Sequence, residues 1–113
     1  MNSVRKQPFN NTPSHGHKAG PLFRLGHIVA TPAALEQLGK HGVDPAALLS
    51  RHVRGDWGDL CKSDLQANDM ALQDGSRIFS AYVIGADKFF VITEQIGEDQ
   101  TRASTCIMRA EDY

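Results

Sequence analysis

Apolar residues recur at helical spacing through the first two thirds of the chain, and each such stretch opens with a helix-start signal. Thr31-Pro32 and Asp44-Pro45 each combine a capping side chain with a proline, whose missing N–H costs nothing in a first helical turn. Ser63 and Gln66 have the spacing of a capping box, in which each side chain bonds the other residue's N–H. The pattern predicts three short helices, at residues 33–38, 45–53 and 63–73.

The same spacing predicts which helical side chains are buried and where each helix ends. The apolar positions expected to face the interior are Leu35, Leu38, Leu65, Met70 and Leu72. The glycines expected to end the three helices are Gly39 or Gly42, Gly55 and Gly75.

Beyond residue 76 the chain changes to strand-like segments rich in Phe, Val, Ile and Tyr. Segments 77–84 and 88–93 are joined by Gly85-Ala86-Asp87, a hairpin connection, and segment 101–108 follows a polar loop. Segment 22–30 is apolar and β-branched near its end, so it is a candidate fourth strand. The predicted fold is α+β: three short helices followed by a three- or four-stranded antiparallel sheet, with the helices packed on one face.

The first 21 residues have a different composition, dominated by Asn, Ser, Pro, Gly and His, and show no apolar periodicity. We expect a flexible N-terminal tail here and a single domain over residues 22–113, because such a segment has little to bury. A chain that starts near Leu22 should therefore fold. His15 and His17 could chelate a metal weakly, but a stable site needs more ligands on a fixed frame.

The composition argues against some classes of function but does not indicate a specific one. Apolar residues make up 41% and charged residues 22% of the 113, as in ordinary globular proteins. A net charge of −1 argues against a generic nucleic-acid binder, and equally against a DNA mimic. Cys61 and Cys106 lack a metal or redox spacing, and no apolar leader or membrane span is seen. We expect a cytoplasmic protein with reduced thiols.

The densest cluster of candidate functional side chains lies at residues 51–60. The only tryptophan, Trp57, stands between two Gly-Asp steps whose glycines permit tight turns. We interpret Trp57 as a buried anchor, with an exposed recognition contact as the alternative. Arg51, His52 and Arg54 fall in the last turn of the second helix, where cations meet the negative end of the helix dipole. We expect these three to be exposed contacts.

Two hypotheses for chemistry in this cluster are weak. Asp56 and Asp59 could hold a divalent cation, but the alternating ligands of a calcium loop are missing. Capping of the turn's own N–H groups explains them better. His52, Asp56 and Cys61 could serve as base, orienter and nucleophile, yet nothing marks a nucleophile turn. We therefore predict no metal, no cofactor and no catalytic residue.

Asn68 and Asp69 are poor helix formers inside the third predicted helix. A tertiary hydrogen bond to the tryptophan turn would explain them, and a substrate contact is the alternative. The candidate binding surface therefore comprises Arg51, His52, Arg54, Asp56, Trp57, Asp59, Asn68 and Asp69.

Five short runs resemble a known family: Arg51-His-Val-Arg-Gly-Asp-Trp-Gly-Asp-Leu60, Gln66-Ala-Asn-Asp69, Ser80-Ala-Tyr82, Ile92-Thr-Glu94 and Glu111-Asp-Tyr113. The family consists of small uncharacterised proteins of plasmids, integrated elements and phages, sometimes labelled plasmid-related or type I restriction-associated. The similarity covers about residues 25–113. Family members continue Ile-Thr-Glu into Asp-Arg-Ser-Val-Thr-Thr and end in Pro-Glu-Glu-Tyr, whereas here the loop after Glu94 is longer and the end reads Arg109-Ala-Glu-Asp-Tyr113. The resemblance implies a mobile-element context and no established activity.

The resemblance, the small size and the lack of a catalytic set together predict a mobile-element accessory protein that acts as a non-enzymatic binding module. One hypothesis is inhibition of a host defence nuclease complex of the restriction or CRISPR type. The expected partner is another protein or a protein–nucleic-acid complex, not a membrane. The alternative is a small metal-dependent hydrolase or nuclease that uses His52, Asp56 and Asp59. Direct DNA binding through the paired short helices is a third class, and the net charge argues against it.

Overall fold

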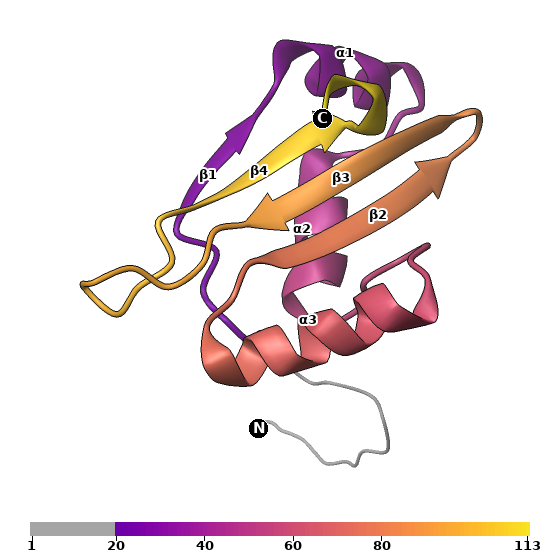
Figure 1. The fold of residues 1–113 in the computed structure, drawn as a ribbon. Coiled ribbons are helices and arrows are strands. Elements are labelled where there is room, and N and C mark those ends of the chain that lie inside the picture. The colour runs from indigo at the N-terminus through magenta and orange to yellow at the C-terminus, as the bar shows by residue number, and fades with distance from the viewer. Residues whose placement is uncertain (1–19) are drawn as a thin grey trace, which may run out of the picture.

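The computed structural model describes residues 20–113, and both proline-started helices are present where the sequence predicts them (Figure 1). Helix α1 spans Pro32–Lys40 and helix α2 spans Pro45–Val53. The Ala34 N–H donates to Thr31 Oγ1 at 3.1 Å, and the Ala46 N–H donates to Asp44 Oδ1 at 2.9 Å. Of the predicted tail, residues 1–19 lie outside the described part of the chain.

Helix α3 (Lys62–Asp74) begins earlier than the sequence predicts. Its N-cap is Cys61, which makes no capping hydrogen bond through its side chain, so the predicted capping box of Ser63 and Gln66 is wrong. The reason is that Ser63 already lies inside the first turn, where its side chain is past the cap position. The helix ends as predicted at Gly75, which adopts φ +80°.

The buried faces of two helices differ from the prediction. Leu38 is fully buried, but its partner on the inner face of α1 is Ala34, and Leu35 is 47% exposed. In α3 the buried residues are Asn68 and Ala71, and Met70 is 66% exposed. Leu35 and Met70 each follow a buried residue of the same helix by only one or two positions, which turns them toward solvent.

Four strands form one sheet in the order β1-β4-β3-β2. Their bounds are β1 His27–Ala30, β2 Ile78–Ile84, β3 Asp87–Thr93 and β4 Ser104–Arg109. Strands β2, β3 and β4 form the predicted antiparallel meander, with Gly85-Ala86 as the turn of the first hairpin. Strand β1 is parallel to β4, because the helices and two further strands lie between them and bring the chain back to the same end of the sheet. The fold class is therefore α+β, with a mixed sheet that is antiparallel except at β1.

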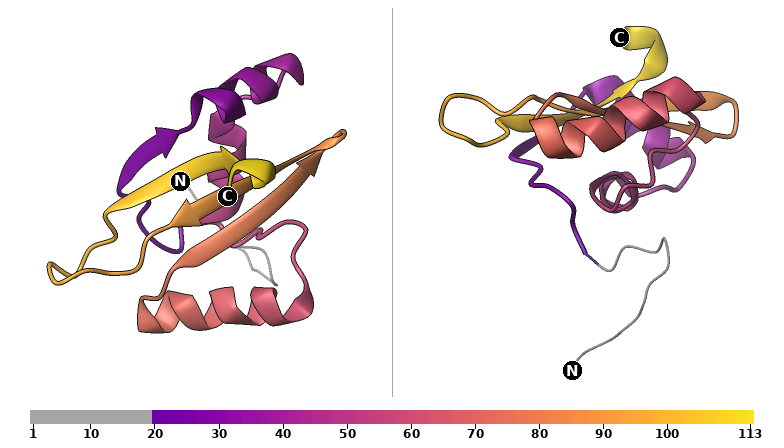
Figure 2. Two further views of the ribbon diagram at one scale, coloured as in Figure 1. Left: turned by 45° about the horizontal axis from the view of Figure 1, so that its top comes forward. Right: turned by 60° about the horizontal axis from the view of Figure 1, so that its bottom comes forward.

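The core lies on the face of the sheet that the helices cover. One cluster joins α1 and α2 to the sheet through Ala34, Leu38, Leu48, Tyr82, Phe89, Val91 and Ile107. A second cluster joins Trp57, Ala71 of α3 and Ile78 of β2. Figure 2 shows α2 and the C-terminal 3-10 helix η1 (Ala110–Asp112) on opposite faces of the sheet.

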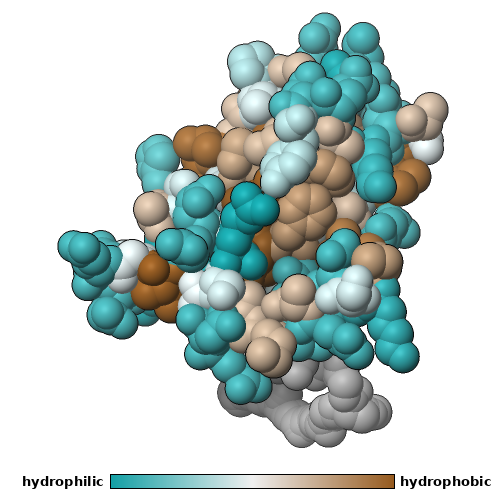
Figure 3. Space-filling view, viewed as in Figure 1, coloured by the Kyte–Doolittle hydropathy of each residue, from teal (hydrophilic) through white to brown (hydrophobic). Residues whose placement is uncertain are grey.

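The opposite face of the sheet carries no helix of residues 20–113 other than η1. Phe79, Phe90 and Met108 lie half-buried there, and the ring of Tyr113 packs edge-on against both phenylalanines. Figure 3 shows this face, with apolar residues gathered over the sheet. No helix within the described range is long and apolar enough to cross a membrane.

Candidate functional site

The segment between α2 and α3, residues 54–60, is here called the Trp loop, and its backbone runs alongside β2. The Ala81 N–H donates to the Trp57 carbonyl at 3.1 Å, and the Asp59 N–H donates to the Ala81 carbonyl at 2.7 Å. Gly58 lies between these bonds with φ +77°, and a Cβ there would stand 2.0 Å from the Ala81 oxygen. Only glycine allows the loop to approach the strand this closely.

Two side chains complete the hydrogen bonding along the outer edge of β2. Asn68 of α3 donates to the Phe79 carbonyl at 2.6 Å and accepts from the Phe79 N–H at 3.0 Å. The Asp59 carboxylate accepts from the Val83 N–H at 3.0 Å. Because alternate residues of an edge strand point their polar groups outward, the Trp loop and Asn68 cover the groups that would otherwise pair with another chain.

Trp57 is the anchor of this arrangement. Its side chain is 5% exposed, and its ring lies 6.2 Å from that of Phe23 and 5.9 Å from that of His52. The indole Nε1–H donates to Asp69 Oδ1 at 3.3 Å, which is the tertiary bond expected from the Asn68-Asp69 pair. The interpretation of Trp57 as a buried anchor is confirmed, and the alternative of an exposed contact is wrong.

His52 is fully buried, so its prediction as an exposed cation is wrong. It follows Leu48 by one helical turn and therefore shares the inner face of α2, whereas Arg51 and Arg54 are exposed. Its Nδ1 lies 2.6 Å from Ser80 Oγ and its Nε2 lies 2.9 Å from Thr93 Oγ1. Both ring nitrogens are engaged inside the protein.

The bonds of His52 belong to a chain whose direction can be assigned. The Leu25 carbonyl can only accept, so Thr105 Oγ1 donates to it at 2.7 Å and must accept from Thr93 Oγ1, also at 2.7 Å. Thr93 has then used its proton, so His52 Nε2 is the donor to Thr93, and Nδ1 accepts from Ser80. The neutral form of His52 therefore carries its proton on Nε2.

Burial, reinforced by the positive charge of Arg102, lowers the pKa of His52 from 6.5 to about 4. The neutral ring is therefore the form present near pH 7. An imidazole locked between two hydroxyls and shielded by Phe23 and Trp57 has no access to a substrate proton.

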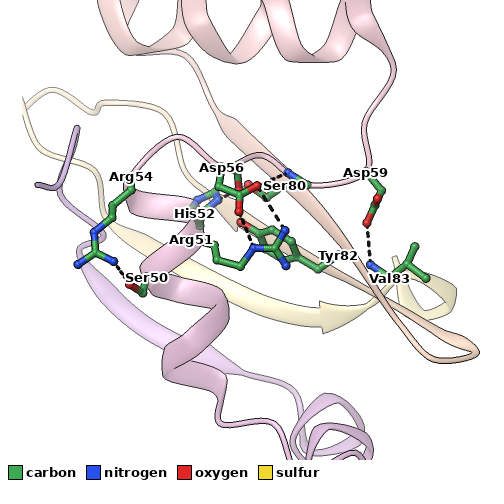
Figure 4. A network of polar contacts seen from close by, with 10 residues as sticks. Ser50, Arg51, His52, Arg54, Asp56, Asp59, Ser80, Tyr82 and Val83 are labelled. Atoms are coloured by element: carbon green, nitrogen blue, oxygen red, sulfur yellow. Dashed lines mark hydrogen bonds and ion pairs between the residues drawn. The ribbon is translucent and has the colours of Figure 1, made fainter. Parts of the chain in front are cut away.

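Arg51 and Asp56 form a two-bond ion pair on the surface of the Trp loop (Figure 4). Arg51 Nε lies 2.6 Å from Asp56 Oδ2, and the guanidinium sits over the ring of Tyr82 at 4.3 Å from its centroid. The Tyr82 hydroxyl donates to the Asp56 carbonyl at 2.7 Å, and the Gly58 N–H donates to Asp56 Oδ1 at 3.2 Å. The bond from Arg51 lowers the pKa of Asp56. The predicted capping of the turn by Asp56 is confirmed.

The groups named in the enzymatic alternative do not converge. His52 faces Ser80 and Thr93, Asp56 faces Arg51, and Asp59 bonds the Val83 N–H on the far side of the loop (Figure 4). Within residues 20–113, no group of three or more His, Cys, Asp or Glu side chains is placed to hold a metal ion.

Five of the eight candidate residues remain exposed on and around the Trp loop, and we call this set the loop surface: Arg51, Arg54, Asp56, Asp59 and Asp69. His52, Trp57 and Asn68 are buried behind it. Arg54 bonds Ser50 Oγ at 2.5 Å, so even this side chain is held near the end of α2 (Figure 4).

Sequence reasoning missed the polar residues that hold the site from inside. Ser80, Thr93 and Thr105 are fully buried hydroxyls at inward positions of strands that are otherwise apolar, and that interruption was the available signal. Arg102, 7% exposed, donates to the carbonyls of Ala71, Ser76 and Glu94, and no sequence pattern marks it.

Comparison with known proteins finds no protein family, no curated protein and no solved structure that matches this chain.

Proposed function

We propose that the protein is a non-enzymatic binding module that recognises another protein, or a protein–nucleic-acid complex, through the loop surface. The observation that carries the proposal is the internal engagement of the candidate catalytic groups. His52 is neutral and enclosed, Asp56 is paired with Arg51, and Asp59 is used as a backbone acceptor. A general base must reach a substrate proton, which the enclosed ring of His52 cannot do. The carboxylates of Asp56 and Asp59 are each held by a different partner, so the three groups do not converge on one substrate or metal ion.

The rigidity of the loop surface supports recognition. Its backbone is hydrogen-bonded to β2, and its glycine turns are fixed by Trp57 beneath them. A rigid surface loses little entropy on association, so more of the contact energy appears as affinity. Two arginines and three aspartates lie on it, and such interspersed opposite charges confer orientation and specificity on a protein partner.

For the partner, we propose a host defence nuclease complex, of which this protein would be an inhibitor carried by a mobile element. The support is the resemblance of residues 25–113 to small plasmid and phage proteins. A plasmid bearing target sites should transform cells with an active restriction or CRISPR-type system more efficiently when this protein is co-expressed. The same plasmid without target sites is the control, and equal efficiencies for both plasmids would reject this partner class.

A matched pair of charge reversals tests the loop surface in that assay. Arg54→Glu changes an exposed residue of the loop surface, and Lys40→Glu makes the same change at the exposed end of α1. Arg54→Glu should abolish the protective effect, and Lys40→Glu should leave it intact. Loss of the effect in both variants, or in neither, would remove the loop surface from the proposal.

The hydrolase or nuclease alternative is tested on the purified protein. Incubation with Mg²⁺ or Mn²⁺ and single- or double-stranded DNA or RNA should give no turnover. Cleavage that disappears in a folded Asp56→Ala variant would replace the binding proposal with an enzymatic one.

A further inference from the structure

Arg102 is a cation in the interior without a carboxylate partner. Its side chain is 7% exposed, and it forms no ion pair within residues 20–113. Its three hydrogen bonds go to backbone carbonyls: Nη1 to Ser76 at 2.7 Å and Glu94 at 3.0 Å, and Nη2 to Ala71 at 3.1 Å. Carbonyl dipoles offset only part of the cost of removing a full charge from water.

Two of the five N–H donors of Arg102 have no acceptor in the described part of the chain, namely Nε–H and the second N–H of Nη2. In a planar guanidinium, the Nε–H and one N–H of Nη2 point side by side along the same edge. Their spacing matches the two oxygens of a carboxylate, which binds such an edge with two parallel hydrogen bonds.

Arg102 lines a cleft of about 650 Å³ between the segment before β1 and the loop before β4. The apolar lining consists of Pro21, Phe23, Leu25 and Val53, and the polar lining includes Arg24 and Thr101. The Phe23 ring lies 5.7 Å from the Arg102 guanidinium carbon, so an aromatic wall stands directly beside the charge. A second hollow, lined again by Phe23, Arg24, Thr101 and Arg102, adjoins it.

The chain itself does not supply the missing carboxylate. Asp99, in the adjacent loop, accepts from the Thr101 N–H at 3.0 Å, and Asp74 accepts from the Ser76 N–H at 2.9 Å. Residues 1–19 contain no Asp or Glu, so that part of the chain has no acidic side chain to bring to the cleft. Neither Asp74 nor Asp99 therefore forms an ion pair with Arg102.

We propose that this cleft binds a carboxylate carried on an apolar body, with the free edge of Arg102 holding the two oxygens and Arg24 providing a second cation at the rim. The apolar walls take the body of the ligand, as in most small-molecule sites, where a few polar groups fix the orientation. Two sources fit this chemistry: a small aromatic or aliphatic acid, and the C-terminal carboxylate of a peptide that ends in an apolar residue.

The test uses the full chain and simple probes. Benzoate should bind in a calorimetric titration with a Kd of about 1 mM or tighter, as expected for a ligand of its size. Binding should also change the fluorescence of Trp57, the only tryptophan, whose ring lies 6.2 Å from that of Phe23. Benzamide has the same shape without the charge and should bind at least about tenfold more weakly. Equal binding of the two would overturn the proposal, and so would no binding of benzoate.

Variants distinguish binding of benzoate in the cleft from non-specific attraction of an anion to positive charges. Arg24→Gln should weaken benzoate binding several-fold, and Arg54→Gln, the same change at an exposed arginine outside the cleft, should not. Arg102→Lys keeps a positive charge but loses the two-pronged edge, so a folded Arg102→Lys protein should lose benzoate binding. If that variant fails to fold, the comparison of the Arg24 and Arg54 variants still decides, and equal effects of the two would reject the cleft.

Two further probes identify the class and source of the ligand. A peptide C-terminus would be favoured if N-acetyl-phenylalanine bound more tightly than benzoate and its carboxamide derivative, which lacks the carboxylate, did not bind. A small acid would be favoured if benzoate bound more tightly than N-acetyl-phenylalanine. Phenyl phosphate binding more tightly than every carboxylate would overturn the assignment of a carboxylate.

Discussion

Position 52 lies one helical turn after Leu48 on the inner face of α2, where an apolar residue would be expected, but the residue is a histidine. The ring fills that core position because each nitrogen meets a hydroxyl, Ser80 on one side and Thr93 on the other. Such a network is stabilising only when each member is satisfied, and here the Leu25 carbonyl provides the final acceptor. As a consequence, the stability of the fold is sensitive to protonation of His52.

Acid should therefore weaken the fold through His52. The pKa of His52 in the folded protein, about 4, lies below the ordinary value of 6.5, so the unfolded chain takes up a proton that the folded protein excludes. The neutral His52 ring contributes fully to the free energy of unfolding above pH 6.5. This contribution is lost as the pH falls toward 4, and the total loss is about 3 kcal/mol. Urea unfolding at several pH values measures it. His52→Gln has no titrating group at this position and should show a correspondingly flatter profile; identical profiles would contradict the assignment.

Gly58 is the second residue on which the structure of the site depends, because it allows the Trp loop to approach β2. Gly58→Ala should destabilise the protein by several kcal/mol, because the added methyl group meets the Ala81 oxygen as well as an unfavourable φ of +77°. Gly42→Ala is the matched control, since Gly42 has φ +69° but open space around its Cβ position. Its cost should be only about 1 kcal/mol, the strain of the left-handed conformation alone. Equal costs would mean that the Trp loop does not press against β2.

Trp57 gives a third prediction at the residue scale. Because its ring is 5% exposed and packs on Ala71 and Ile78, Trp57→Ala should cost about 3–5 kcal/mol. A chemical denaturation curve indistinguishable from that of the parent would show that the ring is not an anchor.

At the scale of elements, local signals predicted more than long-range ones. Helix capping and turn formation depend only on residues close by in the sequence. The two helix starts and the hairpin could therefore be predicted from Thr31-Pro32, Asp44-Pro45 and Gly85-Ala86. The buried face of α3 was not, because it depends on the edge strand that the helix meets. Met70 has the apolar character expected of a core residue, yet the position facing β2 belongs to Asn68.

The same limit applies to the candidate site. The glycine turns of the Trp loop, and a tertiary bond between the Asn68-Asp69 pair and that loop, could be inferred from composition and spacing, and the structure provides this bond from Trp57 to Asp69. The parallel pairing of β1 with β4 and the hydroxyl chain around His52 join residues far apart in the sequence. No local pattern encodes such pairings.

Asn68 carries the prediction at the element scale. Asn68→Ala should cost about 2 kcal/mol, because it leaves both the N–H and the carbonyl of Phe79 without a protein partner at a part-buried edge. Gln66→Ala, at an exposed position of the same helix, should change stability by less than about 0.5 kcal/mol. The Phe79 amide should also exchange its hydrogen faster in the Asn68 variant. Unchanged exchange would mean that Asn68 does not close the edge.

At the scale of the whole molecule, the helices cover one face of the sheet, and the Trp loop closes the edge at β2. The loop surface, the cleft beside Arg102 and the apolar face around Phe90 are three separate regions. We propose that the loop surface is a rigid recognition surface and that the groups that look catalytic in residues 51–60 hold the structure together.

Photo-crosslinking in cells measures whether the loop surface contacts a partner. A photoreactive amino acid replaces Arg54 on the loop surface in one chain and Lys40 at the exposed end of α1 in another. We predict one discrete crosslinked protein from position 54, which competes away when unmodified protein is in excess, and none from position 40. No specific product at position 54, or the same product at both positions, would contradict the account.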